Sequence, residues 1–84
     1  IDELIVNVKK KIKKNIKIED ISIEDKTFLH KKHPGHKSNK FHLKIIIMSD
    51  ELKRLNKIES SKKIYKILEE ELKNHIHSLQ ILVN

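Results

Sequence analysis

Histidine is the residue type with the greatest chemical potential in this chain. Three of the six histidines lie in one short stretch, His30-Lys-Lys-His33-Pro-Gly-His36, and two more stand near the carboxyl end, at His75 and His77. The sequence contains no cysteine. Because thiolates are the usual ligands of soft metal centres, a centre that uses these imidazoles needs thiolates from another molecule. The histidines therefore predict a metal site that depends on a partner.

Length and composition narrow the possible classes of protein. The 84 residues suffice for one small domain, 1–84, without a deep enclosed active site. The lack of cysteine excludes a disulfide framework, a zinc ribbon and a thiol nucleophile. The longest apolar run, at 45–48, has strand length, so we expect no membrane association. The first residue is Ile1, so we expect a fragment with any targeting segment upstream, and the compartment, cytoplasmic or mitochondrial, stays open.

The basic charge of the chain raises the question of nucleic-acid binding. The formal net charge is +7, yet Arg54 is the only arginine among 19 basic residues. Specific recognition of phosphates and guanine edges favours the arginine fork over lysine. We therefore interpret the charge mostly as compositional bias and expect any binding of nucleic acid to be weak.

The first half of the sequence predicts a helix followed by two strands. Apolar residues recur at three- and four-residue steps over 1–16, which indicates an amphipathic helix with a solvated lysine face. A β-branched stretch predicts a strand at 18–23. The polar segment 26–40 holds the only proline and the only glycine, so it is predicted to be a loop. Residues 41–48 alternate and then become continuously apolar, as in a strand that packs against helices.

The second half predicts two helices and a last strand. Ser49 is the expected cap of a short helix that reaches Asn56, with acidic residues in its first turn. Ser60 or Ser61 is the expected cap of the closing helix, which should end at Asn74. Its apolar face consists of Ile64, Ile67, Leu68 and Leu72. Residues 76–83 then read as a strand in which simple alternation places His77 with Leu79, Ile81 and Val83, opposite Ile76, Ser78, Gln80 and Leu82.

Several motifs in this order resemble those of BolA-like proteins. They are Asp25-Lys-Thr27-Phe-Leu-His30, similar to D-x-S-x-x-H; His33-Pro-Gly35-His36, similar to H-x-G-H; and a closing helix that runs into Ile76-His77-Ser-Leu79, similar to V-H-A-L. His42-Leu43 stands where the family has His-Phe. The resemblance covers essentially the whole chain. It implies an α+β fold of the type II KH-like class, an α-β-β-α-α-β sandwich whose three-stranded mixed sheet has helices on one face.

The resemblance also implies a metal site. In BolA-like proteins the histidine that matches His77 is a ligand of a [2Fe-2S] cluster shared with a monothiol glutaredoxin, which supplies its own cysteine and the thiol of glutathione. A loop histidine completes the set, and three extra residues here divide that motif between His30 and His33. The expected metal ligands are thus His77 with His33 or His30, while His36 shares the loop. These loop histidines alternatively form a solvated stretch that binds zinc or nickel fortuitously.

The function implied is that of a non-enzymatic adaptor in iron-sulfur cluster assembly or transfer, monomeric when alone. No nucleophile is paired with an oriented base, so no catalytic residue is expected. The alternative is a KH-like nucleic-acid-binding or transcriptional regulatory protein. Against it, residues 56–61 contain no Gly-x-x-Gly clamp, and Ser60-Ser61-Lys62 stands where the family often has Arg-His-Arg. His42 and His75 are interpreted as structural or surface residues.

Overall fold

The computed structural model describes residues 2–27 and 41–84, and within these residues the chain forms four helices and three strands. In chain order they are α1 (Asp2–Asn15), β1 (Asp20–Asp25), β2 (Phe41–Met48), α2 (Asp50–Lys53), α3 (Lys57–Ile67), α4 (Glu69–Asn74) and β3 (Ile76–Val83). None of these described helices is long and apolar enough to cross a membrane. The predicted order is confirmed, except that the closing helix is divided into α3 and α4.

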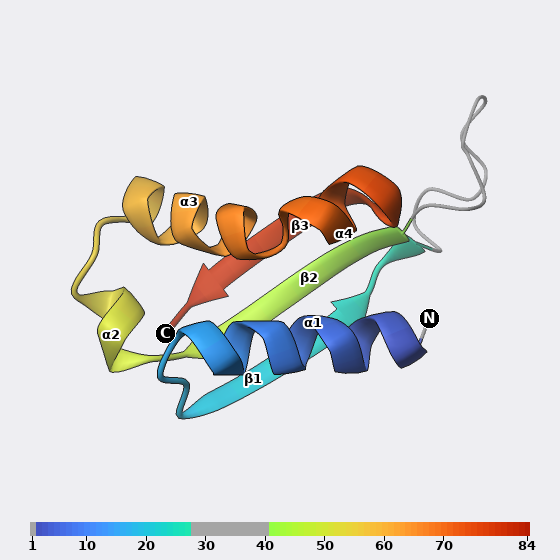
Figure 1. The fold of residues 1–84 in the computed structure, drawn as a ribbon. Coiled ribbons are helices and arrows are strands. Elements are labelled where there is room, and N and C mark those ends of the chain that lie inside the picture. The colour runs from blue at the N-terminus through green and yellow to red at the C-terminus, as the bar shows by residue number, and fades with distance from the viewer. Residues whose placement is uncertain (1, 28–40) are drawn as a thin grey trace.

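The three described strands form one mixed sheet with β2 at its centre. β2 pairs antiparallel with β1 and parallel with β3, so the predicted mixed sheet is confirmed. Figure 1 shows α1 and α3 on the same side of this sheet. Leu43, Ile45 and Ile47 of β2 are buried on the helix side, whereas Met48 and Leu82 on the opposite face are 51% and 41% exposed. Alternation along the strands thus gives the sheet one buried face and one open face.

The apolar core lies between the helices and the sheet. Ile64 and Leu68, predicted from the helical spacing of the closing helix, are fully buried. Ile67 and Leu72 are partly buried and pack against the core. The remaining buried members come from α1, from the strands and from their connections: Val8, Ile12, Ile16, Ile21, Leu43, Ile45, Ile47, Leu52 and Ile76. The apolar face predicted for the closing helix is therefore confirmed.

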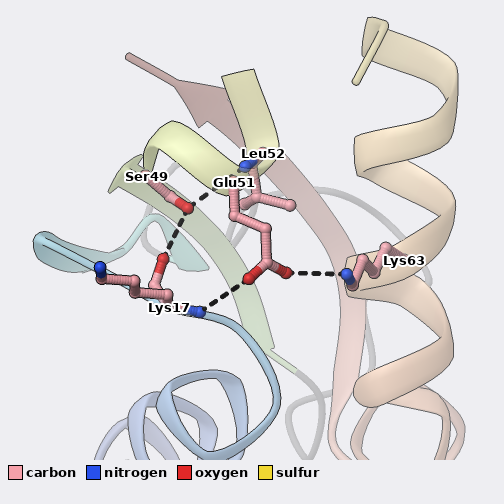
Figure 2. Close-up of polar contacts among 5 residues, drawn as sticks. All are labelled: Lys17, Ser49, Glu51, Leu52 and Lys63. Atoms are coloured by element: carbon pink, nitrogen blue, oxygen red, sulfur yellow. Dashed lines mark hydrogen bonds and ion pairs between the residues drawn. The ribbon is translucent and has the colours of Figure 1, made fainter. Parts of the chain in front are cut away.

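Ser49 begins α2 as predicted and also joins two parts of the chain. Its Oγ accepts a hydrogen bond from the backbone N–H of Leu52 at 3.3 Å and donates one to the carbonyl of Lys17 at 2.7 Å (Figure 2). Ser49 itself is fully buried. The cap thus satisfies a free helix N–H and at the same time holds the connection between α1 and β1.

The predicted boundaries of the next helix are wrong. Asn56, expected to end α2, instead caps α3, because its side-chain oxygen accepts the N–H of Glu59 at 2.8 Å. Ser60 and Ser61, the expected caps, lie inside α3. The hydroxyl of Ser60 donates to the carbonyl of Lys57 at 3.1 Å, so it bonds back within the first turn. Asparagine and serine cap helices almost equally well, and the sequence alone favoured the wrong one.

The closing helix breaks at Leu68 and ends where it was predicted to end. Leu68 has φ −98° and ψ 18°, which departs from helical geometry and separates α3 from α4. α4 runs to Asn74, the predicted stop. Lys11 of α1 holds this short helix through bonds of 2.9 and 3.0 Å to the two carboxylate oxygens of Glu71. This hydrogen bond raises the pKa of Lys11.

β1 begins two residues later than predicted. Its pairing with β2 runs from Asp20 opposite Met48 to Asp25 opposite Leu43. Ile18, the predicted first residue, packs against the core without joining the ladder. Acidic residues have low strand propensity, so Asp25 did not read as part of a strand, but the backbone hydrogen bonds to β2 outweigh that preference.

Candidate functional site

His77 lies near the start of β3, at an irregularity in the sheet. Phe41 is opposite Ile76, and the next residue of β2, His42, is opposite Ser78. His77 is therefore the additional residue of a β-bulge. Because of this extra residue Ile76, and not His77, lies in the core, and His77 is exposed. The predicted alternation is wrong for these two residues and correct from Ser78 onward.

The bulge brings a second imidazole to His77. The ring centroids of His42 and His77 are 4.9 Å apart, with the ring planes inclined at 54°. His42 is buried, and its Nδ1 lies 2.6 Å from Oγ of Ser78. The expectation that His42 is merely a structural or surface residue thus missed a direct contact with the predicted ligand. His75 fits that expectation, because it is exposed and ends α4.

The chain enters and leaves residues 28–40 at this same end of the sheet. The backbone N–H of Lys26 bonds the carbonyl of His42 at 2.7 Å, and that of Phe41 bonds the carbonyl of His75 at 2.9 Å. Thr27 is buried, and its Oγ1 accepts the N–H of His42 at 3.2 Å. The residues that flank 28–40 are therefore attached beside the pair of imidazoles.

The Asp25–Thr27 motif forms the first of these attachments. Asp25 accepts the backbone N–H of Thr27 at 2.9 Å and also a hydrogen bond from the Thr27 hydroxyl. An aspartate that bonds the backbone two residues ahead produces a tight turn at the end of β1. The D-x-S-like spacing noted in the sequence thus forms a tight turn directly after β1. His30, His33 and His36 lie outside the described residues.

Comparisons with known proteins identify the family of the chain. The sequence pattern of the BolA-like protein family matches residues 12–84. The chain belongs to the BolA-like family. A relative from Haemophilus influenzae, described as the DNA-binding transcriptional regulator BolA, is 32% identical over 74 residues, which are 88% of this chain and 69% of the relative.

Solved structures share the BolA fold. The BolA domain of SufE1 from Arabidopsis thaliana is 25% identical and superposes with a TM-score of 0.79 over 94% of this chain and 87% of that domain. BolA1 from the same plant is 22% identical, with a TM-score of 0.80 over 95% of this chain and 88% of its own. The solution structure of BolA1 from Mus musculus is 15% identical and superposes with a TM-score of 0.75. The match covers 94% of this chain and 62% of the mouse protein. The predicted α+β architecture is therefore confirmed.

Within residues 2–27 and 41–84, the donor groups near His77 are too few to hold a metal ion by themselves. The described residues contain no group of three or more histidine, cysteine, aspartate or glutamate side chains placed to hold a metal ion. His77 offers an exposed imidazole, and a hollow of about 290 Å³ next to His42 is lined by Lys26 and Lys44 among others. Lys26 is paired with Glu24 at 3.7 Å. The described residues thus present one exposed imidazole beside Lys44, and any metal bound here needs further ligands.

Proposed function

We propose that this BolA-like protein is a non-enzymatic adaptor that binds a monothiol glutaredoxin and shares a [2Fe-2S] cluster with it. The observation that carries the proposal is the position of His77, an exposed imidazole on a strand bulge at the sheet end where residues 28–40 are attached. Membership of a family that generally contains regulators and adaptors supports the non-enzymatic role.

The proposed ligands from this chain are His77 and either His33 or His30, with His36 in the same segment. Neutral imidazole is a suitable ligand for iron, and thiolates from the glutaredoxin cysteine and from glutathione complete the set. This division of ligands fits a chain without cysteine. The hollow beside His42 offers Lys44 as a cation for a carboxylate of glutathione, whereas the ammonium of Lys26 is paired with Glu24 at 3.7 Å.

The decisive experiment mixes this protein anaerobically with a [2Fe-2S]-loaded monothiol glutaredoxin and records visible absorption and circular dichroism. We expect a one-to-one complex whose spectrum differs from that of the glutaredoxin alone. His77→Ala should remove this difference and keep the far-ultraviolet spectrum of the fold. The matched control is His75→Ala, an exposed histidine two positions away, which should behave as the wild type.

Two further measurements sharpen the assignment of ligands. Single substitutions of His30, His33 or His36 should act more weakly than His77→Ala, because neighbouring histidines can replace one another. Lowering the pH through the imidazole range should mimic His77→Ala, since a proton competes for the same lone pair. Equal spectra and equal cluster stability for wild type and His77→Ala would refute the ligand assignment and leave only a docking role.

A second candidate function is nucleic-acid binding, which is favoured by the name of the Haemophilus relative. The exposed lysines of α1, at 10, 13 and 14, provide positive charge for it. The segment between α2 and α3 spans only residues 54–56 and has no glycine clamp. We expect duplex DNA binding to be weak, indifferent to sequence and lost steeply with added salt. A selective complex that tolerates salt, measured by fluorescence anisotropy, would reverse this ranking.

A further inference from the structure

The two edges of the sheet differ in their charge. β1, at one edge, carries Asp20, Glu24 and Asp25 within six residues. β3, at the other, has eight residues and neither a charged side chain nor a proline. Charged residues and proline are the usual means by which edge strands avoid pairing with other chains. The β3 edge therefore lacks the protection that β1 has.

The backbone of β3 has hydrogen-bonding groups that point to this open edge. The N–H of Asn84 bonds the carbonyl of Ile47 at 2.8 Å, so Asn84 faces β2. Successive residues of a strand point their backbone groups to opposite sides, so those of Leu79, Ile81 and Val83 face outward. The Tyr65 hydroxyl bonds the Leu79 carbonyl at 3.2 Å. Among the described residues, no such partner is recorded for the outward groups of Ile81 and Val83.

A hollow lies beside these outward groups. It has a volume of about 330 Å³ and is bordered by the last residues of β3, by Leu52 and Leu55 near α2, and by Ser60 at the start of α3. Leu82 of β3 also lines it and is 41% exposed. A strand paired with Ile81 and Val83 would pass along this hollow and could place one apolar side chain in it.

The charge around the hollow indicates which kind of segment would pair with the β3 edge. Lys57 is the charged side chain that lines the hollow, and it is exposed. The chain as a whole carries a formal charge of +7. A second copy would bring the same excess positive charge and be repelled, whereas an acidic segment would be attracted.

We propose that the open edge of β3 near Ile81 and Val83 binds an extended acidic segment of a partner protein by adding it as a fourth strand. One apolar side chain of that segment enters the hollow, and a carboxylate faces Lys57. His77 is four residues from Ile81 and six from Val83 along β3, roughly 13 and 20 Å at strand spacing, so a segment that pairs only with the last residues of β3 leaves His77 uncovered. The proposal does not depend on the cluster-sharing function.

The test uses a panel of synthetic eight-residue peptides of alternating threonine and valine. Each peptide contains two glutamates and one leucine, and the position of the leucine differs from one peptide to the next. We expect saturable one-to-one binding for at least one register. Hydrogen exchange should then slow at the amides of Ile81 and Val83 and stay unchanged at Gln80 and Leu82, which already bond β2. Replacing the two glutamates with lysines should weaken binding.

Two pairs of variants separate edge pairing from general adhesion. Leu82→Glu should weaken binding of the acidic peptide by roughly tenfold or more, because it places a repelling charge on the edge strand beside the added strand. Met48→Glu adds the same charge on the same open face, but on the central strand, and should bind as the wild type. Lys57→Glu should reverse the preference to the lysine peptides, and Lys53→Glu, on α2 and outside the hollow, should not.

Several outcomes would overturn the proposal. One is the absence of binding by every peptide in the panel. Another is binding without slower exchange at Ile81 and Val83, which would place the peptide elsewhere. Sedimentation that shows a dimer whose Ile81 and Val83 amides are protected without peptide would assign the edge to a second copy instead.

Discussion

The two ends of the sheet are built differently. At the end where β2 stops, Ser49 and Glu51 tie three parts of the chain together (Figure 2): the Glu51 carboxylate accepts the backbone N–H of Lys17 at 3.3 Å and the ammonium of Lys63 at 2.8 Å. At the end where β2 starts, two imidazoles meet at a bulge, and one of them, His77, is exposed. The first end connects elements through side chains, and the second presents a donor group to other molecules.

This difference separates a polar group that acts within the fold from one that is open to solvent. A buried, bonded serine such as Ser49 contributes to folding and has no accessible group left for a ligand. An exposed histidine on a bulge contributes little packing and keeps its lone pair available. Substitutions at the two ends should therefore affect different measurements.

The largest effect should come from the core that both ends share. Ile64→Ala, at a fully buried position, should lower the free energy of unfolding by about 2–5 kcal/mol, since it removes packed methyl groups and leaves a cavity. The matched control is Ile58→Ala on the same helix, where the side chain is 67% exposed and the change should stay within about 0.5 kcal/mol. Urea unfolding measures both. Similar values for the two variants would contradict the assignment of the core.

A smaller effect is expected at the connected end. Ser49→Ala should cost about 1–3 kcal/mol, because the buried N–H of Leu52 and the partly buried carbonyl of Lys17 lose their partner. The spectral response to the loaded glutaredoxin should be unchanged. Ser22→Ala, an exposed serine on β1, is the control for the loss of a hydroxyl. A change in cluster spectra with Ser49→Ala would break the distinction between the two ends.

At the imidazole end the stability effect should be smaller still. Ser78→Ala removes the 2.6 Å contact with His42 and should cost no more than about 1.5 kcal/mol. It should nevertheless shift the ring signals of both His42 and His77 in the NMR spectrum, because the two rings are in contact. His75→Ala should leave both sets of signals in place. Unshifted ring signals in Ser78→Ala would show that the hydroxyl does not orient His42.

The smallest effect concerns pH. The hydrogen bond from Lys63, followed by that from the Lys17 backbone, lowers the pKa of Glu51 below its usual 4.5. The stability that these contacts contribute is therefore fully present above pH 4.5. It is lost as the pH falls through the lowered pKa that Glu51 has in the folded protein. The difference in the free energy of unfolding between wild type and Glu51→Gln should therefore decrease as the pH falls across that range. Because both partners are substantially exposed, added salt should shrink it too.

Much of the fold was predictable because local periodicity reports burial. The three- and four-residue spacing of α1 and of the closing helix, and the apolar run of β2, identify the faces that the core covers. Ser49 was also predictable as a cap, since the acidic residues after it complete a typical helix start. The histidines are a partial success. The position of His77 on a strand is confirmed, while the roles of His30, His33 and His36 stay predictions.

By itself the sequence determined the order of elements and the apolar faces of the helices, because these follow from local pattern. The need for thiolates from a partner stays a prediction from the absence of cysteine. Only the tertiary structure decided that β1 extends to Asp25, that Asn56 caps α3, and that His77 leaves the core face and meets His42. The cap by Asn56 is local, since its side-chain oxygen bonds the N–H of Glu59 three residues on, but the other two features depend on backbone bonds or ring contacts between residues distant along the chain. Their free energy exceeds the small local preferences that a sequence pattern records.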